Sequence, residues 1–208
     1  MGREGLLFAA YALGGYLLGG IFFSSILAKV ICGVDIEACS RDGNPGTANA
    51  MKYAGKLVGS LCLICDLGKG FFPVWIAAQF LPVGAFSFAL VMAAPVMGHA
   101  FSPMLRGRGG KAIAATFGVL LGLLPYWQPV AILVVLYIFF SVVVVIRPHR
   151  LRTIWTFTLF AAGCLLFCKA ASIVIGCVAI SAVVLCRHLS PTPDEAGREL
   201  VVLGRKIR

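Results

Sequence analysis

Basic residues and glycines alternate in the segment GHAFSPMLRGRGGKAIA, residues 98–114, directly before an apolar stretch. The alternating residues are Arg106, Gly107, Arg108, Gly109, Gly110 and Lys111. Glycines ahead of a helix N-terminus expose backbone N–H groups that, together with the helix dipole and a lysine, favour phosphate binding. The segment does not match the GxxxxGK[ST] pattern of nucleotide-hydrolysing loops, because Ala112 follows Lys111 where that pattern has serine or threonine. The segment is therefore either a phosphate site or a basic loop with flexible glycines.

A second polar segment, SRDGNPGTANAMKYAGK at residues 40–56, has a composition that suits anion binding. Its glycines let the backbone approach a ligand, its asparagines offer fixed amides, and its basic residues supply charge. The residues concerned are Arg41, Asp42, Gly43, Asn44, Gly46, Asn49 and Lys52. The alternative is a helix-capping turn at Asn44 and Pro45.

The three histidines are His99, His149 and His188. His99 adjoins the glycine-rich segment and His188 ends the last apolar block, so an imidazole at either place can orient or deprotonate a hydroxyl. No carboxylate stands at HExxH-like spacing, and the CxxC formed by Cys62 and Cys65 has no second pair. We expect no metal site.

Long apolar blocks must position these segments. Of the 208 residues 60% are hydrophobic and 12% charged, outside the range of soluble globular domains. A membrane-spanning helix needs about 20 apolar residues. The sequence predicts an all-α polytopic bundle, a single membrane-embedded domain over residues 1–208, with about seven transmembrane helices at 6–31, 57–80, 84–102, 111–125, 127–146, 153–168 and 170–187. The fourth is short, so five or six spans with a re-entrant piece are the alternative.

Lysines and arginines orient the spans, because short cytoplasmic loops carry the excess. With the N-terminus outside and the C-terminus cytoplasmic, nearly all the basic residues of the connectors fall inside: Arg41, Lys52, Lys56, Arg106, Arg108, Lys111, Arg147, Arg150, Arg152, Arg187, Arg198, Arg205, Lys206 and Arg208. The opposite loops hold only Lys169. Because the basic residues gather on the side that faces anionic lipids and solutes, the net charge of +10 does not require a nucleic-acid partner.

Two charges, Asp66 and Lys69, lie within the second span, three residues apart on one helix face. Ionisable groups at membrane depth usually pair with each other or line a polar cavity. They form either a structural ion pair or, with Lys69, the edge of the anion site.

These segments resemble the bacterial membrane acyltransferases that transfer an acyl chain from acyl phosphate to the sn-1 hydroxyl of glycerol 3-phosphate. The residues that match the family's motifs are Gly43, Asn44, Gly46, Asn49, Asp66, Lys69, Gly70, Gly98, His99, Phe101, Leu105, Gly109, Gly110, Lys111 and Ala114. The chain departs from the motifs where Asp42 replaces a serine, Lys52 an arginine and Pro191 an asparagine, and Thr153 is the nearest hydroxyl in a loop that usually carries serines. It resembles a divergent member.

The resemblance implies a plasma-membrane enzyme whose active site faces the cytoplasm and whose partners are acyl phosphate, glycerol 3-phosphate and membrane lipids, with no cofactor. We expect a monomer. The implied catalytic residues are His188, Lys111 and Asn49. The implied substrate-binding residues are Asp42, Asn44, Gly46, Lys52, Lys69, His99, Arg108, Gly109, Gly110 and Thr153. The alternatives are an acyltransferase with another phosphorylated polyol acceptor and a non-catalytic anion transporter.

Overall fold

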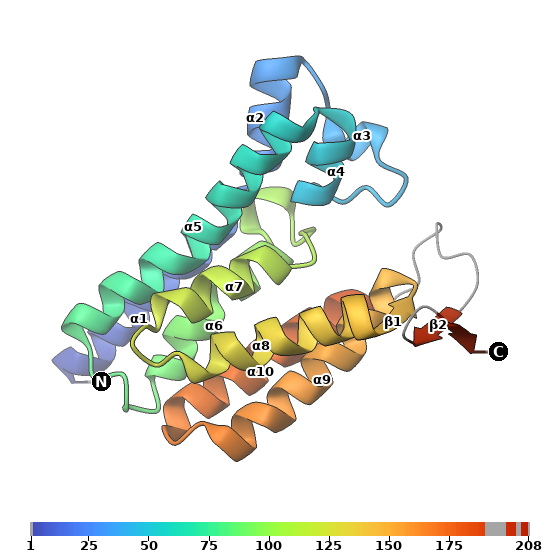
Figure 1. Ribbon diagram of the computed structural model, residues 1–208. Coiled ribbons are helices and arrows are strands. Elements are labelled where there is room, and N and C mark those ends of the chain that lie inside the picture. The colour runs from blue at the N-terminus through green and yellow to red at the C-terminus, as the bar shows by residue number, and fades with distance from the viewer. Residues whose placement is uncertain (1, 190–198, 203–204, 208) are drawn as a thin grey trace.

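The structure, a computed structural model, describes residues 2–189, 199–202 and 205–207. Helices make up almost all of it (Figure 1). In chain order the elements are α1 (Arg3–Gly19), α2 (Phe23–Cys32), α3 (Ile36–Cys39), α4 (Thr47–Tyr53), α5 (Lys56–Phe80), α6 (Phe88–Ala100), the 3-10 turn η1 (Pro103–Leu105), α7 (Ile113–Gly122), α8 (Gln128–Ile138), the π-helical η2 (Phe139–Val143), β1 (Val144–Arg147), α9 (His149–Phe167), α10 (Ala171–Leu189), β2 (Glu199–Val202) and β3 (Arg205–Ile207).

Five helical segments of the described chain are long and apolar enough to cross a membrane. They are Arg3–Cys32, Lys56–Phe80, Phe88–Leu105, His149–Phe167 and Ala171–Leu189. Shorter apolar helices, Ile113–Gly122 and Gln128–Val143, occupy the places of the fourth and fifth predicted spans. The helical bundle is as predicted, whereas the antiparallel sheet β1-β2-β3 at one end was not predicted.

The first predicted span is interrupted between α1 and α2, and the carbonyl groups released there find side-chain donors. The Ser102 hydroxyl donates to the Gly20 carbonyl at 2.7 Å, and Lys69 Nζ donates to the Ile21 carbonyl at 2.7 Å. Backbone groups at membrane depth must be satisfied internally. The break is therefore a supported feature, and it directs α2, α3 and α4 over one end of the bundle (Figure 1).

Helices approach closely where glycines face a neighbouring backbone. A Cβ on Gly98 would overlap the Tyr16 carbonyl of α1, and one on Gly118 would overlap the Leu67 carbonyl of α5. Small residues allow such contacts between membrane helices. Because α7 is pressed against the middle of α5, the loop before α7 lies beside Asp66 rather than beyond the start of α5.

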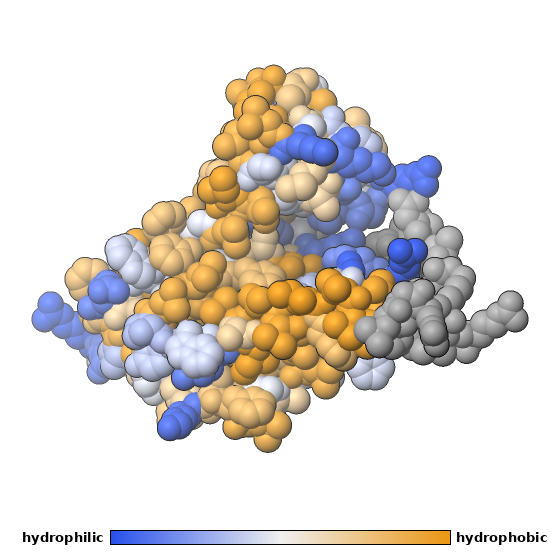
Figure 2. Space-filling model, viewed as in Figure 1, coloured by the Kyte–Doolittle hydropathy of each residue, from blue (hydrophilic) through white to orange (hydrophobic). Residues whose placement is uncertain are grey.

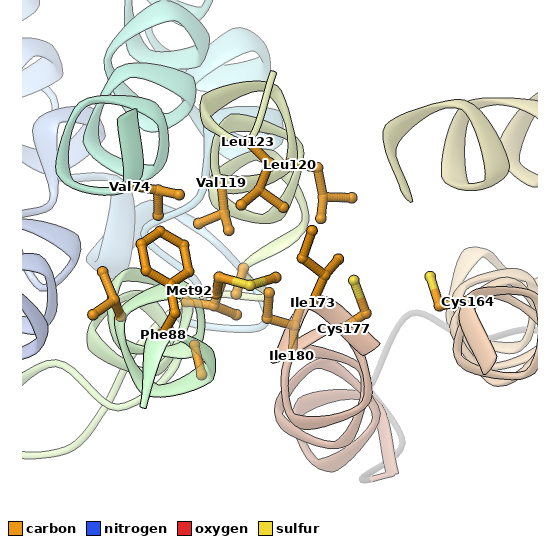
Figure 3. Packing of buried hydrophobic residues seen from close by; sticks show 14 of the residues in the cluster. Val74, Phe88, Met92, Val119, Leu120, Leu123, Cys164, Ile173, Cys177 and Ile180 are labelled. Carbon is orange, nitrogen blue, oxygen red and sulfur yellow. The ribbon is translucent and has the colours of Figure 1, made fainter. Parts of the chain in front are cut away.

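The core is continuous between α5, α6, α7 and α10. Val74, Met92, Val119 and Ile180 interdigitate there (Figure 3). Cys164 and Cys177 lie on facing helices in the same region, and both are buried free thiols. This packing fixes α7, which follows the glycine-rich segment, and α10, which carries His188 near its end.

Candidate active site

Three connectors and the end of α10 meet at one end of the bundle. The Asp42 carboxylate, before α4, lies 3.3 Å from Lys111 Nζ, before α7. Arg187 at the end of α10 donates to the Gly109 carbonyl at 2.6 Å. Arg150, in the first turn of α9, donates to the His188 carbonyl at 3.3 Å. The segments that hold the predicted site residues are therefore bound to one another.

A cavity of about 570 Å³ opens among these segments. Its lining residues are Asp42, Asn44, Gly46, Thr47, Ala48, Asn49, Leu63, Asp66, Leu67, His99, Lys111, Ala112, Ile113, Ala114, Phe117, Pro148, His149 and Arg150. Figure 2 shows hydrophilic residues gathered in a recess between the α2–α4 cap and the rest of the bundle, whose visible surface is largely apolar. The cavity thus joins a charged region to the apolar faces of α5 and α7.

Lys111 and the N-terminus of α7 form the positive side of this cavity. The side chain of Lys111 is about one-third exposed, at 35%. The residues from Lys111 to Ala114, which include the first two residues of α7, all line the cavity. A helix N-terminus presents unpaired N–H groups and partial positive charge, so this end of α7 suits an anion.

Asp42 is held in place by the loop that carries it. Its Oδ1 accepts hydrogen bonds from Asn49 Nδ2 at 2.9 Å and from the Asn44 backbone N–H at 3.3 Å. Partial burial acts to raise the pKa of Asp42, but these hydrogen bonds and the charge of Lys111 outweigh it, so the pKa lies below its usual value. The carboxylate is consequently ionised at neutral pH.

A buried polar cluster forms the floor of the cavity. Asp66 Oδ1 lies 2.9 Å from Lys69 Nζ and 4.0 Å from His99 Nδ1, and its Oδ2 accepts a hydrogen bond from the Thr47 hydroxyl at 2.7 Å. Lys69 Nζ also lies 4.7 Å from the centre of the Phe22 ring. The cluster joins α4, α5, α6 and the break after α1, so it fixes the cap against the bundle.

The paired glycines lie behind the cavity instead of lining it. The Gly110 N–H donates to the His99 carbonyl at 3.0 Å, and both glycine carbonyls accept from Arg187. A Cβ on Gly110 would overlap His99 Nε2, and one on Gly109 would overlap the His99 carbonyl oxygen. Glycine is needed at both positions because His99 and its backbone occupy the space.

Six of the predicted site residues line the cavity: Asp42, Asn44, Gly46, Asn49, His99 and Lys111. The other seven do not: Lys52, Lys69, Arg108, Gly109, Gly110, Thr153 and His188. Lys52 and Arg108 are exposed, and Thr153 is buried with its hydroxyl donating to the His149 carbonyl at 3.1 Å. His188 is buried behind the cavity. Pro191 lies outside the described residues.

Sequence reasoning missed His149, Arg150 and Thr47 as cavity residues. Within residues 147–153, Thr153 was predicted as a binding residue and His149 was not. A sequence signal existed, since His149 lies among the basic residues Arg147, Arg150 and Arg152. Thr47 carried no signal, because its hydrogen bond to Asp66 joins two segments that are separate in the sequence.

The comparisons with known proteins bear on this arrangement. The sequence model of the glycerol-3-phosphate acyltransferase family matches residues 9–193. The chain belongs to this family. It is 44% identical over 110 residues to the glycerol-3-phosphate acyltransferase of Azotobacter vinelandii, covering 53% of this chain and 57% of that protein. It is 39% identical over 106 residues to that of Thermotoga petrophila, covering 51% and 53%. The aligned segments span little more than half the length of these relatives.

A solved structure shares the fold of this glycerol-3-phosphate acyltransferase family member over most of both chains. The crystal structure of PlsY (YgiH), an integral membrane glycerol 3-phosphate acyltransferase in its glycerol 3-phosphate form, matches with a TM-score of 0.74 at 25% identity, covering 87% of this chain and 88% of that one. The lysophosphatidic acid form matches with a TM-score of 0.73 at 23% identity. The family resemblance and the all-α membrane bundle predicted from the sequence are confirmed.

Proposed function

We propose that the chain transfers a fatty acyl group from acyl phosphate to the sn-1 hydroxyl of glycerol 3-phosphate, which gives lysophosphatidate for phospholipid synthesis. One observation carries the proposal: a single cavity has Lys111 and the start of α7 on one side and the apolar residues Leu63, Leu67 and Phe117 on another. A phosphate group and a hydrocarbon chain both fit such a surface. Family membership supports the same reaction.

The cavity suggests how the reaction proceeds. The acceptor hydroxyl oxygen attacks the acyl carbonyl carbon, the carbon–oxygen bond to phosphate breaks, and inorganic phosphate leaves. The departing phosphate can take the hydroxyl proton, so the protein contributes chiefly positioning and charge stabilisation, which are worth about 7 kcal/mol or more for well-oriented reactants. Lys111, with Arg150 on another wall of the cavity, would stabilise the negative charge of the phosphate. The acyl chain would lie along α5 and α7.

One of two histidines, His188 or His149, is proposed to orient the acceptor hydroxyl. Within the described residues, His188 Nε2 is buried without a hydrogen-bond partner, while its Nδ1 lies 2.7 Å from the Val184 carbonyl. His149 lines the cavity directly. Asn49 and Asn44, on the opposite loop, offer amides to the glycerol hydroxyls.

Turnover by the purified chain tests the proposal. Reconstituted in lipid vesicles, it should convert acyl phosphate and radiolabelled glycerol 3-phosphate into lysophosphatidate, measured by chromatography of the lipid product. Other phosphorylated polyols, offered in parallel, test the alternative acceptor, which is motivated by Asp42 in place of the family's serine. Acyl thioesters, offered in place of acyl phosphate, test the donor. Anion flux across the vesicle membrane without acyl transfer would instead identify a transporter and contradict the proposed function.

We infer that the chain works as a monomer in the plasma membrane, crosses it about seven times and turns the cavity toward the cytoplasm. The concentration of arginine and lysine at the cavity end supports this orientation. The exposed thiols of Cys32, Cys39 and Cys186 belong to segments at that end. Ser87, exposed between α5 and α6, belongs to the opposite end.

Thiol labelling measures the orientation. With serine at Cys168, which is partly exposed between α9 and α10 at the opposite end, a membrane-impermeant maleimide should leave Cys32, Cys39 and Cys186 unlabelled in intact bacterial cells and should label them once the membrane is opened. When Cys32, Cys39 and Cys186 are replaced by serine as well, Ser87→Cys should be labelled in intact cells. The reverse pattern would place the cavity outside and contradict the inferred orientation.

A further inference from the structure

The Asp42 carboxylate forms an ion pair with Lys111, the cation that the substrate phosphate is proposed to bind. Its Oδ2 is 3.3 Å from Lys111 Nζ, across the cavity from the loop that holds it. Asn49 and the Asn44 backbone fix the other oxygen, so the carboxylate is aimed at the amine instead of turning freely into solvent. The positive side of the cavity is therefore already neutralised in part by the protein itself.

A carboxylate and a phosphate compete for the same donors. Both are anionic oxygen acceptors, and both form charge-assisted hydrogen bonds with an ammonium group. A phosphate that reaches Lys111 would stand next to the Asp42 charge, and like charges at short range repel. Binding consequently requires that the carboxylate withdraw from the amine.

The loop has a structural means of withdrawing. Gly43, directly after Asp42, has a φ of +58°, and a Cβ there would have open space around it. Asn49 Nδ2 also donates to the Asn44 carbonyl at 2.8 Å, so the amide keeps a partner if the carboxylate leaves. Residues 41–43 are exposed, so they are not part of the buried core.

We propose that Asp42 is an internal competitor for the phosphate site: its carboxylate holds Lys111 when no substrate is bound, and the substrate phosphate displaces it. This inference rests on the proposed function and deepens it. Displacement costs binding free energy, so Asp42 weakens the affinity of the site for phosphate. It also ties the arrival of phosphate to a movement of the loop that carries Asn44 and Asn49.

Binding measurements without an acyl donor test this inference separately from turnover. The probes are inorganic phosphate and glycerol 3-phosphate, titrated calorimetrically into the purified chain in lipid nanodiscs. An exposed ion pair is worth up to about 1 kcal/mol, so Asp42→Asn should tighten binding of both probes about two- to fivefold. Asp42→Ser should act in the same direction, and Asp42→Glu, which keeps the charge, should stay near the wild-type affinity.

Hydrogen exchange gives a second readout that a merely structural role would not move. Phosphate should speed amide exchange at residues 41–44 in the wild type and have little effect there in Asp42→Asn. In acyl transfer, Asp42→Asn should lower KM for glycerol 3-phosphate more than it changes kcat. Unchanged or weaker phosphate binding in Asp42→Asn would overturn the inference, and weaker binding would show that Asp42 contacts the ligand favourably. Acyl transfer by the wild type would still support the proposed function in either case.

Discussion

Replacing Lys111 with glutamine is expected to lower the rate of acyl transfer by about a hundredfold or more. Lys111 places its ammonium at the cavity, in front of the first turn of α7. Loss of one preorganised group that stabilises developing charge costs about 10²–10³ in kcat. The measurement is lysophosphatidate formation in proteoliposomes over a range of glycerol 3-phosphate concentrations. Lys111→Arg, which keeps the charge but changes its shape, should retain part of the rate.

Arg106 provides the matched control for this experiment. It is an exposed cation of the same loop, and it does not line the cavity. Arg106→Gln removes the same charge and should change the rate less than about threefold, because exposed charges outside a site contribute little and are screened by salt. Equal losses in the two variants would mean that the loop acts through its general field and that Lys111 has no special position.

The helices could be predicted from hydropathy, but their interruptions could not. Apolar composition does not change between α1 and α2, so residues 6–31 read as one span. The break depends on Ser102 and Lys69, which satisfy two carbonyl groups from positions far away in the sequence. Strand β1, which follows the π-helical η2, likewise depends on a distant segment, because it pairs with β2.

The glycine-rich loop illustrates the same limit at the site. Its composition correctly marked the region beside the cavity, because glycine and lysine before a helix are informative on their own. The local sequence could not distinguish glycines that offer N–H groups from glycines that make room. Gly109 and Gly110 make room for His99, while the N-terminus of α7 faces the cavity. That distinction depends on a contact between α6 and the loop.

Whether Asp66 and Lys69 are structural or part of the anion site can be decided by removing one charge and then both. Asp66→Ala leaves Lys69 buried without its counter-charge and leaves the Thr47 hydroxyl without its acceptor. Breaking a buried ion pair in this way costs about 3–5 kcal/mol. We expect a correspondingly large loss of stability, measured as the unfolding free energy in detergent.

The double variant Asp66→Ala/Lys69→Met should recover a large part of that loss, since a buried pair replaced by apolar side chains is often nearly neutral. Recovery should stay incomplete, because the Ile21 carbonyl loses the Lys69 hydrogen bond and an unsatisfied buried acceptor costs about 1–3 kcal/mol. Phosphate titration of the same double variant then separates the two roles. Asp66 lines the cavity and Lys69 does not, but the double variant removes one charge of each sign, so binding should stay within about threefold of the wild type. A double variant that is stable but has lost phosphate binding would place this pair in the anion site, and a single variant as stable as the wild type would contradict its role in holding the break between α1 and α2.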